Sequence, residues 1–288
     1  MMKSNSYVKS HGLGNEYVIL DEANIDFSLT GKAIRRICNV HHGIGSDGIL
    51  LRVPSSQADF AVRIFNPDGS EAEKSGNGLR IFCKYLFDYG YASNSFTVET
   101  RGGVVIAEII EESLGKAKLI RVDMGQATFR SREIPASFSQ EEALGVDLAV
   151  ADRVFQVNCV SVGNPHCIII KDKLDLNEIM QYGSLIENHK CFPNRINVQF
   201  ARVISPEEVE ILIWERGAGY TLASGSSSCA VASALRKLGL VEQRVTIHMP
   251  GGRLQIEVDD DYNIRMTGPV RQIAEGVLAA ELIEDLEL

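Results

Sequence analysis

Two short stretches of this chain have the residue types and spacing to bind a small anion such as a carboxylate. Ser75-Gly76-Asn77-Gly78 and Ser224-Gly225-Ser226-Ser227 lie 149 residues apart, and each opens an apolar stretch with helical spacing. Serine is among the preferred N-cap residues, so each stretch predicts the start of a helix. The free backbone N–H groups at helix N-termini form anion-binding sites.

The same offset of 149 residues pairs further polar positions. It aligns Asn15 with Asn164, and it aligns Asn66 with Glu215. Coincidence of several polar residues at one offset indicates a duplicated chain with two similar halves. We therefore expect the function to lie in a cleft between the halves, with a helix N-terminus from each.

The elements that must position these residues are mostly short strands. Thr30 to Val40 has the apolar spacing of a helix with Val40 on its apolar side, and Ser226 to Leu238 predicts a second helix. Gly102-Gly103 predicts a hairpin turn. We expect the chain to pass between domains in the polar segment Phe129 to Asp147. Apolar or alternating runs predict strands at 61–65, 95–99, 104–110, 119–122, 155–162, 167–170, 197–203, 209–214, 245–248, 254–258 and 264–266.

Composition narrows the class of protein. The chain has 288 residues, of which 45% are hydrophobic and 23% charged, as expected for a globular protein of about two domains. The formal net charge of −9, with acidic residues spread along the chain, argues against a nucleic-acid partner and fits a small metabolite better. We find no apolar run of membrane-spanning length and no export signal at the start. The protein is expected to be cytoplasmic, with no membrane partner.

Neither a metal nor a nicotinamide cofactor is expected. Cys38 with His41 and His42 lacks a second ligand pair at zinc-site spacing. The run Gly43 to Gly48 satisfies G-x-G-x-x-G, but it follows an expected helix and precedes an expected strand, the reverse of a dinucleotide site. The six cysteines have no C-x-x-C spacing and are expected to be buried free thiols, with Cys229 in the core.

Five Gly-rich segments occur in one order along the whole chain. Each alone is typical of an ordinary turn, but together they are specific. With them, the sequence resembles the diaminopimelate epimerase family. The segments are His11-Gly12-Leu13-Gly14-Asn15, Asn66-Pro67-Asp68-Gly69-Ser70, Gly76-Asn77-Gly78, Gly163-Asn164-Pro165-His166 and Glu215-Arg216-Gly217-Ala218-Gly219.

The resemblance implies an α+β fold of two similar domains related by a pseudo-twofold axis, each a curved antiparallel sheet around a central helix. We place the domains at residues 1–127, completed by 271–288, and at residues 128–270. The implied activity is that of an amino-acid epimerase that converts LL- to meso-diaminopimelate without pyridoxal phosphate, metal or other cofactor. A cysteine in each half of such an enzyme serves one face of the substrate's α-carbon, and one removes the proton while the other returns one.

This chain departs from the family at both base positions, because it has Ser75 and Ser224 where the cysteines belong. With a serine hydroxyl roughly five units less acidic than a thiol, the lost base strength is ~7 kcal/mol, or roughly a factor of 10⁵ in rate. The alternative is that the serines are helix N-caps with no catalytic purpose. An engineered replacement and a natural lineage both stay open, although Tyr220 and Ser227, where the family usually has other residues, favour the natural one.

The chain has the residues that the family uses to bind the substrate, although it lacks the two cysteine bases. The resemblance assigns the non-reacting end of the substrate to Asn66, Asn164, Asn197, Glu215 and Arg216, of which Arg216 suits a carboxylate and Glu215 an ammonium. The alternative for these two neighbours is a surface ion pair with no role in binding. His166 is either an acid/base or a buried, hydrogen-bonded histidine. Asn15 and the helix-start residues Gly76, Asn77, Gly225 and Ser226 complete the expected substrate contacts.

Three functions are therefore open. The first is a diaminopimelate epimerase, altered or inactive because of its serines. The second is a related isomerase or lyase on another amino acid, in which a hydroxyl acts as hydrogen-bond donor or acid. The third is a catalytically silent protein that binds an amino acid. The expected partner is a small amino acid in each case, and the resemblance leaves a homodimer open.

Overall fold

The computed structural model describes residues 3–287 and consists of two compact units. Unit 1 runs to Val122 and resumes at Gly268, and unit 2 is Asp123–Thr267. The chain therefore passes from one unit to the other inside strands. The segment 129–147, where we expected the crossing, lies within unit 2 instead. Although this segment is polar, it is not a linker, because its apolar residues Ile134 and Ala143 are buried in the unit.

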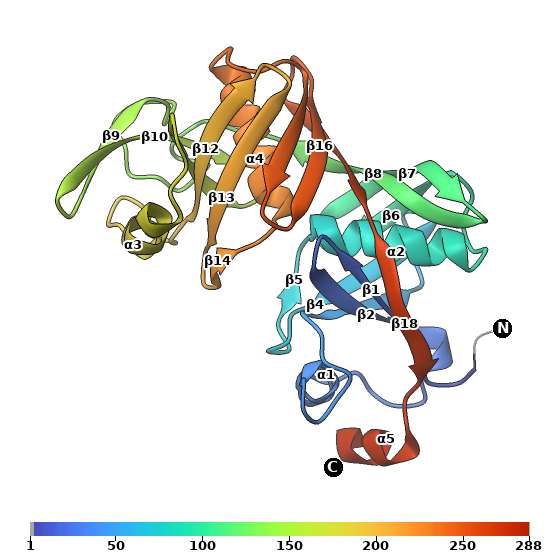
Figure 1. The fold of residues 1–288 in the computed structure, drawn as a ribbon. Coiled ribbons are helices and arrows are strands. Elements are labelled where there is room, and N and C mark those ends of the chain that lie inside the picture. The colour runs from blue at the N-terminus through green and yellow to red at the C-terminus, as the bar shows by residue number, and fades with distance from the viewer. Residues whose placement is uncertain (1–2, 288) are drawn as a thin grey trace. The chain divides into compact units, whose positions relative to one another are not determined.

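The helices and strands of unit 1 begin near the N-terminus and end with the C-terminal segment (Figure 1). They are β1 (Ser6–Gly12), β2 (Asn15–Asp21), the short 3-10 helix η1 (Glu22–Asn24), α1 (Gly31–Cys38), β3 (Ile49–Val53), β4 (Phe60–Phe65), β5 (Glu71–Ala72), α2 (Gly76–Asp88), β6 (Ser95–Thr100), β7 (Gly103–Ser113), β8 (Lys116–Gln126), β18 (Arg271–Val277) and α5 (Ala280–Glu287).

Unit 2 begins within β8 and ends within β17. Its elements are β9 (Val146–Val150), β10 (Arg153–Ser161), β11 (Pro165–Ile170), α3 (Leu176–Glu187), β12 (Asn197–Ser205), β13 (Glu208–Glu215), β14 (Gly219–Thr221), α4 (Gly225–Lys237), β15 (Arg244–Met249), β16 (Gly252–Val258) and β17 (Asn263–Pro269).

The two units have the same strand pairing. In unit 1 the order is β18-β1-β2-β3-β4-β6-β7-β8, in which β2–β3 and β4–β6 are parallel and the other pairs antiparallel. In unit 2 the order is β9-β10-β11-β12-β13-β15-β16-β17, with β11–β12 and β13–β15 parallel. The predicted α+β fold of two similar units is confirmed. The sheets are mixed rather than wholly antiparallel because a helix crosses over between the strands of each parallel pair.

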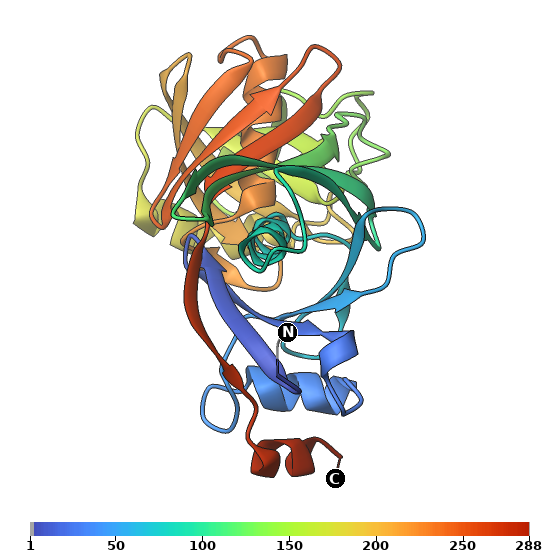
Figure 2. The ribbon, with the colours of Figure 1, turned by 90° about the vertical axis from the view of Figure 1, so that its right-hand side faces the viewer.

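A central helix of 13 residues lies among the strands of each unit, α2 in unit 1 and α4 in unit 2. Figure 2 views α2 nearly end-on, with strands of its unit on several sides of it. Leu79 to Leu86 of α2 and Ser227 to Leu235 of α4 are buried without interruption, as expected for helices that are covered all round. The helices begin at Gly76 and Gly225, so the offset of 149 residues holds at these positions.

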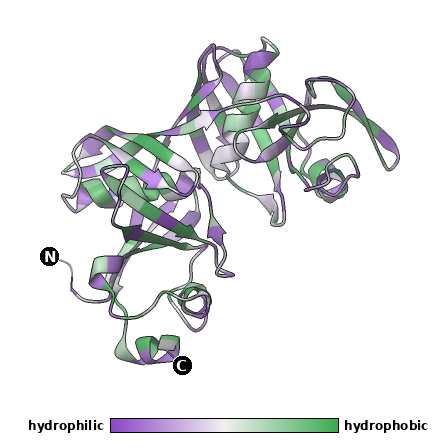
Figure 3. Cartoon of the chain, turned by 180° about the vertical axis from the view of Figure 1, so that it is seen from behind, coloured by the Kyte–Doolittle hydropathy of each residue, from purple (hydrophilic) through white to green (hydrophobic). Residues whose placement is uncertain are grey.

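A second layer covers the outer face of each sheet. In unit 1, α1 and α5 contribute Ile34, Ile37 and Leu286 to a cluster that includes Val18 and Ile49 of the sheet. In unit 2, α3 contributes Ile179, Tyr182 and Ile186 to a cluster that includes Val198 and Phe200 of the sheet. Hydrophobic residues, green in Figure 3, alternate with hydrophilic ones along many of the strands, because each strand has one face on a core.

Val40 is 74% exposed, not on the apolar side of a helix, because α1 ends at Cys38. All six cysteines are free thiols, five of them buried, and Cys229 lies in the core as predicted. Within residues 3–287, no helix has the length and apolar character needed to cross a membrane.

Candidate active site

Ser75 caps the central helix of unit 1. Its backbone is extended, and its Oγ accepts a hydrogen bond from the Gly78 N–H at 3.1 Å. Serine is favoured here because its side chain satisfies one of the free N–H groups of the first turn. The Ser75 side chain is only partly buried, whereas Gly76 and Asn77 are buried. The hydroxyl therefore combines access from outside with a place in the positive end of the helix dipole.

A chain of amide and charged groups holds the first turn of α2 in place. Asn77 Nδ2 donates to Asn15 Oδ1 at 3.2 Å, and Asn15 Nδ2 donates to Asp47 Oδ2 at 3.0 Å. From inside the unit, the fully buried Arg80 donates to Asn77 Oδ1 at 2.7 Å. The predicted site residues Asn15, Gly76, Asn77 and Ser75 are thus brought together. Sequence reasoning missed Arg80 and Asp47, which orient them.

Tyr17 of β2 also reaches Ser75. The two hydroxyl oxygens are 3.3 Å apart. The ring of Tyr17 lies against Gly48, where a Cβ would stand 2.7 Å from Tyr17 Cε1 and 2.4 Å from the Phe65 carbonyl oxygen. Only a glycine fits at position 48 beside this ring without a shift of the backbone or the ring.

We expect Gly48→Ala to destabilise the protein by about 1–3 kcal/mol, because the added methyl overpacks this contact. Gly31→Ala is the matched control, since a Cβ there would find its nearest neighbour, the end of the Arg35 side chain, at 3.5 Å. Chemical denaturation followed by circular dichroism measures both. Equal stability of the two variants would contradict the prediction.

Asn66 stands apart from this group. Its described contacts are within its own turn, where Asn66 Nδ2 donates to Ser70 Oγ at 3.0 Å and Gly69 N donates to the Asn66 carbonyl at 3.0 Å. The structure therefore holds the Asn66 side chain at a defined turn but does not bring it into contact with Ser75.

Ser224 caps the central helix of unit 2 in the same manner. Its Oγ accepts from the Ser227 N–H at 3.4 Å and lies 3.4 Å from Ser226 Oγ, and Gly225 opens the helix. Ser224 is 7% exposed, so it is more buried than Ser75. Ser227, which occupies the position of Gly78 in unit 1, accepts a hydrogen bond from Gln199 Nε2 at 3.0 Å. The extra hydroxyl at 227 is thus satisfied inside the unit.

Glu215 lies beside Ser224. Thr221 Oγ1 donates to Glu215 Oε1 at 3.2 Å, and Ser224 also hydrogen-bonds the carboxylate. Burial raises the pKa of the Glu215 carboxyl, and these two hydrogen bonds oppose part of that rise. The structure therefore brings Glu215, Ser224 and Ser226 together.

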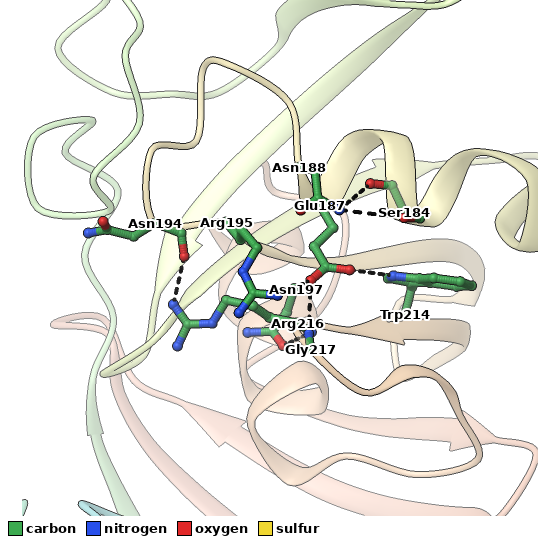
Figure 4. Close-up of polar contacts among 9 residues, drawn as sticks. All are labelled: Ser184, Glu187, Asn188, Asn194, Arg195, Asn197, Trp214, Arg216 and Gly217. Atoms are coloured by element: carbon green, nitrogen blue, oxygen red, sulfur yellow. Dashed lines mark hydrogen bonds and ion pairs between the residues drawn. The ribbon is translucent and has the colours of Figure 1, made fainter.

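Arg216 and Asn197 form a neighbouring group (Figure 4). Asn197 Oδ1 accepts from the Arg216 backbone N–H at 2.9 Å, and Asn197 Nδ2 donates to the Pro165 carbonyl at 2.9 Å. The guanidinium of Arg216 is exposed and donates to the Asn194 carbonyl at 3.2 Å. It is held by a backbone carbonyl, and its remaining donors are available to a carboxylate.

His166 is fully buried on β11 and its Nε2 lies 2.9 Å from Asn164 Oδ1. Burial lowers the pKa of His166 to about 3, so the ring is neutral at physiological pH. Of the two interpretations drawn from the sequence, these features favour the buried, hydrogen-bonded histidine. His166 orients Asn164, the residue expected at the substrate.

Glu187, the last residue of α3, is a further residue that sequence reasoning missed (Figure 4). The residue is 5% exposed, and its carboxylate accepts from Trp214 Nε1 at 2.8 Å, from the Gly217 N–H at 2.8 Å and from Arg195 Nη1 at 3.2 Å. Trp214 packs over Gly183, where a Cβ would lie 2.6 Å from the ring. Glu187 thereby holds both sides of the loop that carries Glu215 and Arg216.

The family model described as diaminopimelate epimerase matches residues 7–130 and 158–273, which include both serines and all of the groups described above. The chain belongs to the diaminopimelate epimerase family. It is 44% identical over 278 residues to diaminopimelate epimerase 2 of a Nostoc species, covering 96% of each chain. It is 40% identical to the diaminopimelate epimerase of Pelotomaculum thermopropionicum, over 94% of this chain and 97% of that one.

Solved structures with low sequence identity share the fold of this family. A probable proline racemase from Agrobacterium radiobacter superposes with a TM-score of 0.72 at 13% identity, over 96% of this chain and 93% of that one. A phenazine biosynthesis protein of the PhzF family from Bacillus anthracis gives a TM-score of 0.69 at 18% identity, over 96% and 100%. At these identities the likeness concerns the fold alone.

The Glu187 network predicts a binding defect. We expect Glu187→Gln to raise KM for an amino-acid substrate about tenfold with little change in kcat, because a lost charge-assisted hydrogen bond loosens the Arg216 loop. Trp214 fluorescence should change as well, since its indole loses a carboxylate partner. Glu257→Gln is the matched control, because Glu257 is an equally buried carboxylate that pairs with Arg244 and Arg265. A KM that rises equally in both variants would contradict the assignment.

Proposed function

We propose that this chain is a cofactor-independent amino-acid epimerase that converts LL- to meso-diaminopimelate, with Ser75 and Ser224 at the two acid/base positions. The proposal rests on one observation: in a chain of this family, the two serines occupy equivalent positions, one in each unit. Each hydroxyl caps the buried central helix of its unit and accepts a first-turn N–H, at 3.1 Å for Ser75 and 3.4 Å for Ser224.

The reaction needs one acid/base group for each face of the α-carbon. One serine reacts as its alkoxide and takes the α-proton as the Cα–H bond breaks, and the electron pair is left on the α-carbon and its carboxylate. The other serine then gives its hydroxyl proton to the opposite face and is left as the alkoxide, so the two serines exchange protonation states in each turnover. Free N–H groups at the starts of α2 and α4 stabilise the negative charge that develops on the substrate carboxylate.

The non-reacting end of the substrate is assigned by charge. The exposed Arg216 guanidinium binds the distal carboxylate in bidentate fashion, and Glu215 faces the distal ammonium. Asn66, Asn164 and Asn197 supply amide hydrogen bonds to the same end. The fixed backbone of Arg216 on Asn197 Oδ1 supports this role, because a loop held in place loses less entropy on binding.

Solvent deuterium incorporation tests the proposal. In D₂O, LL-diaminopimelate should gain deuterium at the α-carbon and yield the meso isomer, at a rate well below that expected for thiol bases. A panel of other amino acids under the same conditions ranks substrates. If diaminopimelate or another amino acid binds and none exchanges, the chain is a binding protein and the proposed epimerase activity is wrong.

We also propose where the enzyme works and how it assembles. We place it in the cytoplasm, where a small amino-acid precursor would be its partner, and we propose a homodimer. Analytical ultracentrifugation tests the second point, since a single species at monomer mass across the working concentration range would exclude the dimer.

A further inference from the structure

The phenol of Tyr17 lies within hydrogen-bond distance of the Ser75 hydroxyl. Tyr17 Oη is 3.3 Å from Ser75 Oγ, and Tyr17 is 6% exposed whereas Ser75 is only partly buried. A small molecule can therefore reach Ser75 from outside, and the phenol meets the serine from within the unit.

The hydrogen bonds of Ser75 leave room for proton exchange with Tyr17. A serine hydroxyl has one proton and two lone pairs. The Gly78 N–H occupies one lone pair of Ser75 Oγ, at 3.1 Å. The Ser75 proton can point to Tyr17 Oη, or the Tyr17 proton can point to the second lone pair, since either oxygen can donate.

The tyrosine ring is held where this contact requires it. The backbone of Gly48 lies against this ring, because a Cβ at position 48 would be 2.7 Å from Tyr17 Cε1. Tyr17 pairs with Ser10 across β1 and β2, which fixes its backbone. The phenol therefore has a defined position relative to the helix cap.

A phenol also has useful acidity. The ordinary pKa of tyrosine is about 10 and that of cysteine about 8.5, whereas a serine hydroxyl is far less acidic than either. A phenol coupled to Ser75 thus recovers part of the base strength that is lost when serine stands in place of cysteine.

We propose that Tyr17 is a positioning residue that exchanges a proton with Ser75 during turnover. The proposal deepens the proposed function and rests on it. When Ser75 Oγ takes the α-proton, its own hydroxyl proton passes to the Tyr17 phenolate, and the electron pair of the Cα–H bond stays on the substrate. In the opposite direction Ser75 gives its proton to the α-carbon and takes the phenol proton, which leaves Tyr17 as phenolate.

The arrangement belongs to Ser75 and is not repeated at Ser224. The offset of 149 residues places His166 at the position of Tyr17, and His166 contacts Asn164 instead of the serine. Ser224 lies beside the Glu215 carboxylate. The two serines therefore have different partners in their own units.

The test is a double-mutant cycle of Tyr17→Phe with Ser75→Cys, measured as α-deuterium exchange on diaminopimelate. Tyr17→Phe alone should lower kcat on the order of 10²-fold with KM unchanged, because an acid/base contribution is lost while binding is kept. In the Ser75→Cys background the same change should have little effect, since a thiolate needs no phenol.

Tyr182→Phe is the matched control. It removes the phenol hydroxyl of another buried tyrosine, which lies in unit 2 and donates to Asp152 Oδ1 at 2.8 Å, so the exchange rate of this variant should equal that of the wild type. Equal loss from Tyr17→Phe in both backgrounds would mean a structural role and would overturn the relay, as would wild-type exchange in the single variant. No exchange in the wild-type chain would instead overturn the proposed function, and the relay with it.

Discussion

The double replacement Ser75→Cys with Ser224→Cys is expected to raise the rate of LL-diaminopimelate epimerisation by up to roughly 10⁵-fold. The physical reason is acidity. A thiol has an ordinary pKa of about 8.5, and a helix N-terminus lowers it further, so a substantial fraction is thiolate near neutral pH. Both serines already occupy the N-cap of a buried helix, so the new thiols would meet the same N–H groups. The measurement is the initial rate of conversion to the meso isomer under reducing conditions.

A matched control separates position from the mere presence of a thiol. Thr30 caps α1 and its side chain accepts from the Ala33 N–H at 3.2 Å, but it lies outside the candidate site. Thr30→Cys should therefore leave the rate unchanged. If the double variant folds and binds diaminopimelate yet epimerises no faster than the wild type, the substrate assignment is wrong.

The second large effect is on stability and concerns a buried ion pair of unit 1. Lys84 Nζ lies 2.7 Å from Asp88 Oδ2, with side chains 6% and 1% exposed. Lys84 also donates to the Ala117 carbonyl at 2.7 Å, and the Ala117 N–H donates to Asp88 Oδ1 at 2.8 Å, so the pair fastens the end of α2 to β8. Lys84→Met should cost about 3–5 kcal/mol, because it leaves the Asp88 carboxylate buried without its countercharge.

Arg236→Met provides the comparison for this prediction. Arg236 pairs with Asp260 across 3.1 Å, and the two side chains are 30% and 94% exposed. Water screens that pair, so its loss should cost no more than about 1 kcal/mol. Urea unfolding followed by far-UV circular dichroism measures both variants. A cost for Lys84→Met as small as that for Arg236→Met would show that the buried pair is not needed for stability.

Local patterns were sufficient to predict much of the fold. The helix expected at Ser226 to Leu238 is α4 (Gly225–Lys237). The hairpin turn expected at Gly102-Gly103 joins β6 and β7 at Arg101-Gly102, and Gly103 is the first residue of β7. These predictions succeed because caps, turns and periodicity depend on neighbours in the chain. The helix α3 was not predicted, and its interior contains Gly183, a residue that disfavours helices. That glycine is explained by Trp214, whose ring leaves no room for a Cβ.

The residues of the candidate site were predictable from the sequence, but their contacts were not. The family, the two N-cap serines and the residues expected to bind an amino acid all follow from motifs and from one repeat offset in the sequence. What those residues contact does not follow from them. His166 is an example, since the sequence left two interpretations open and complete burial against Asn164 favours one.

The sequence by itself thus determined the duplication, the helix starts and the chemical type of the site. Only the tertiary structure decided which groups support each serine and each loop. Tyr17 meets Ser75 across 58 residues of chain, and Glu187 meets Gly217 across 30. Such contacts depend on strand register and on how a helix lies against a sheet, and a shift of one residue in a strand would turn the Tyr17 side chain to the opposite face.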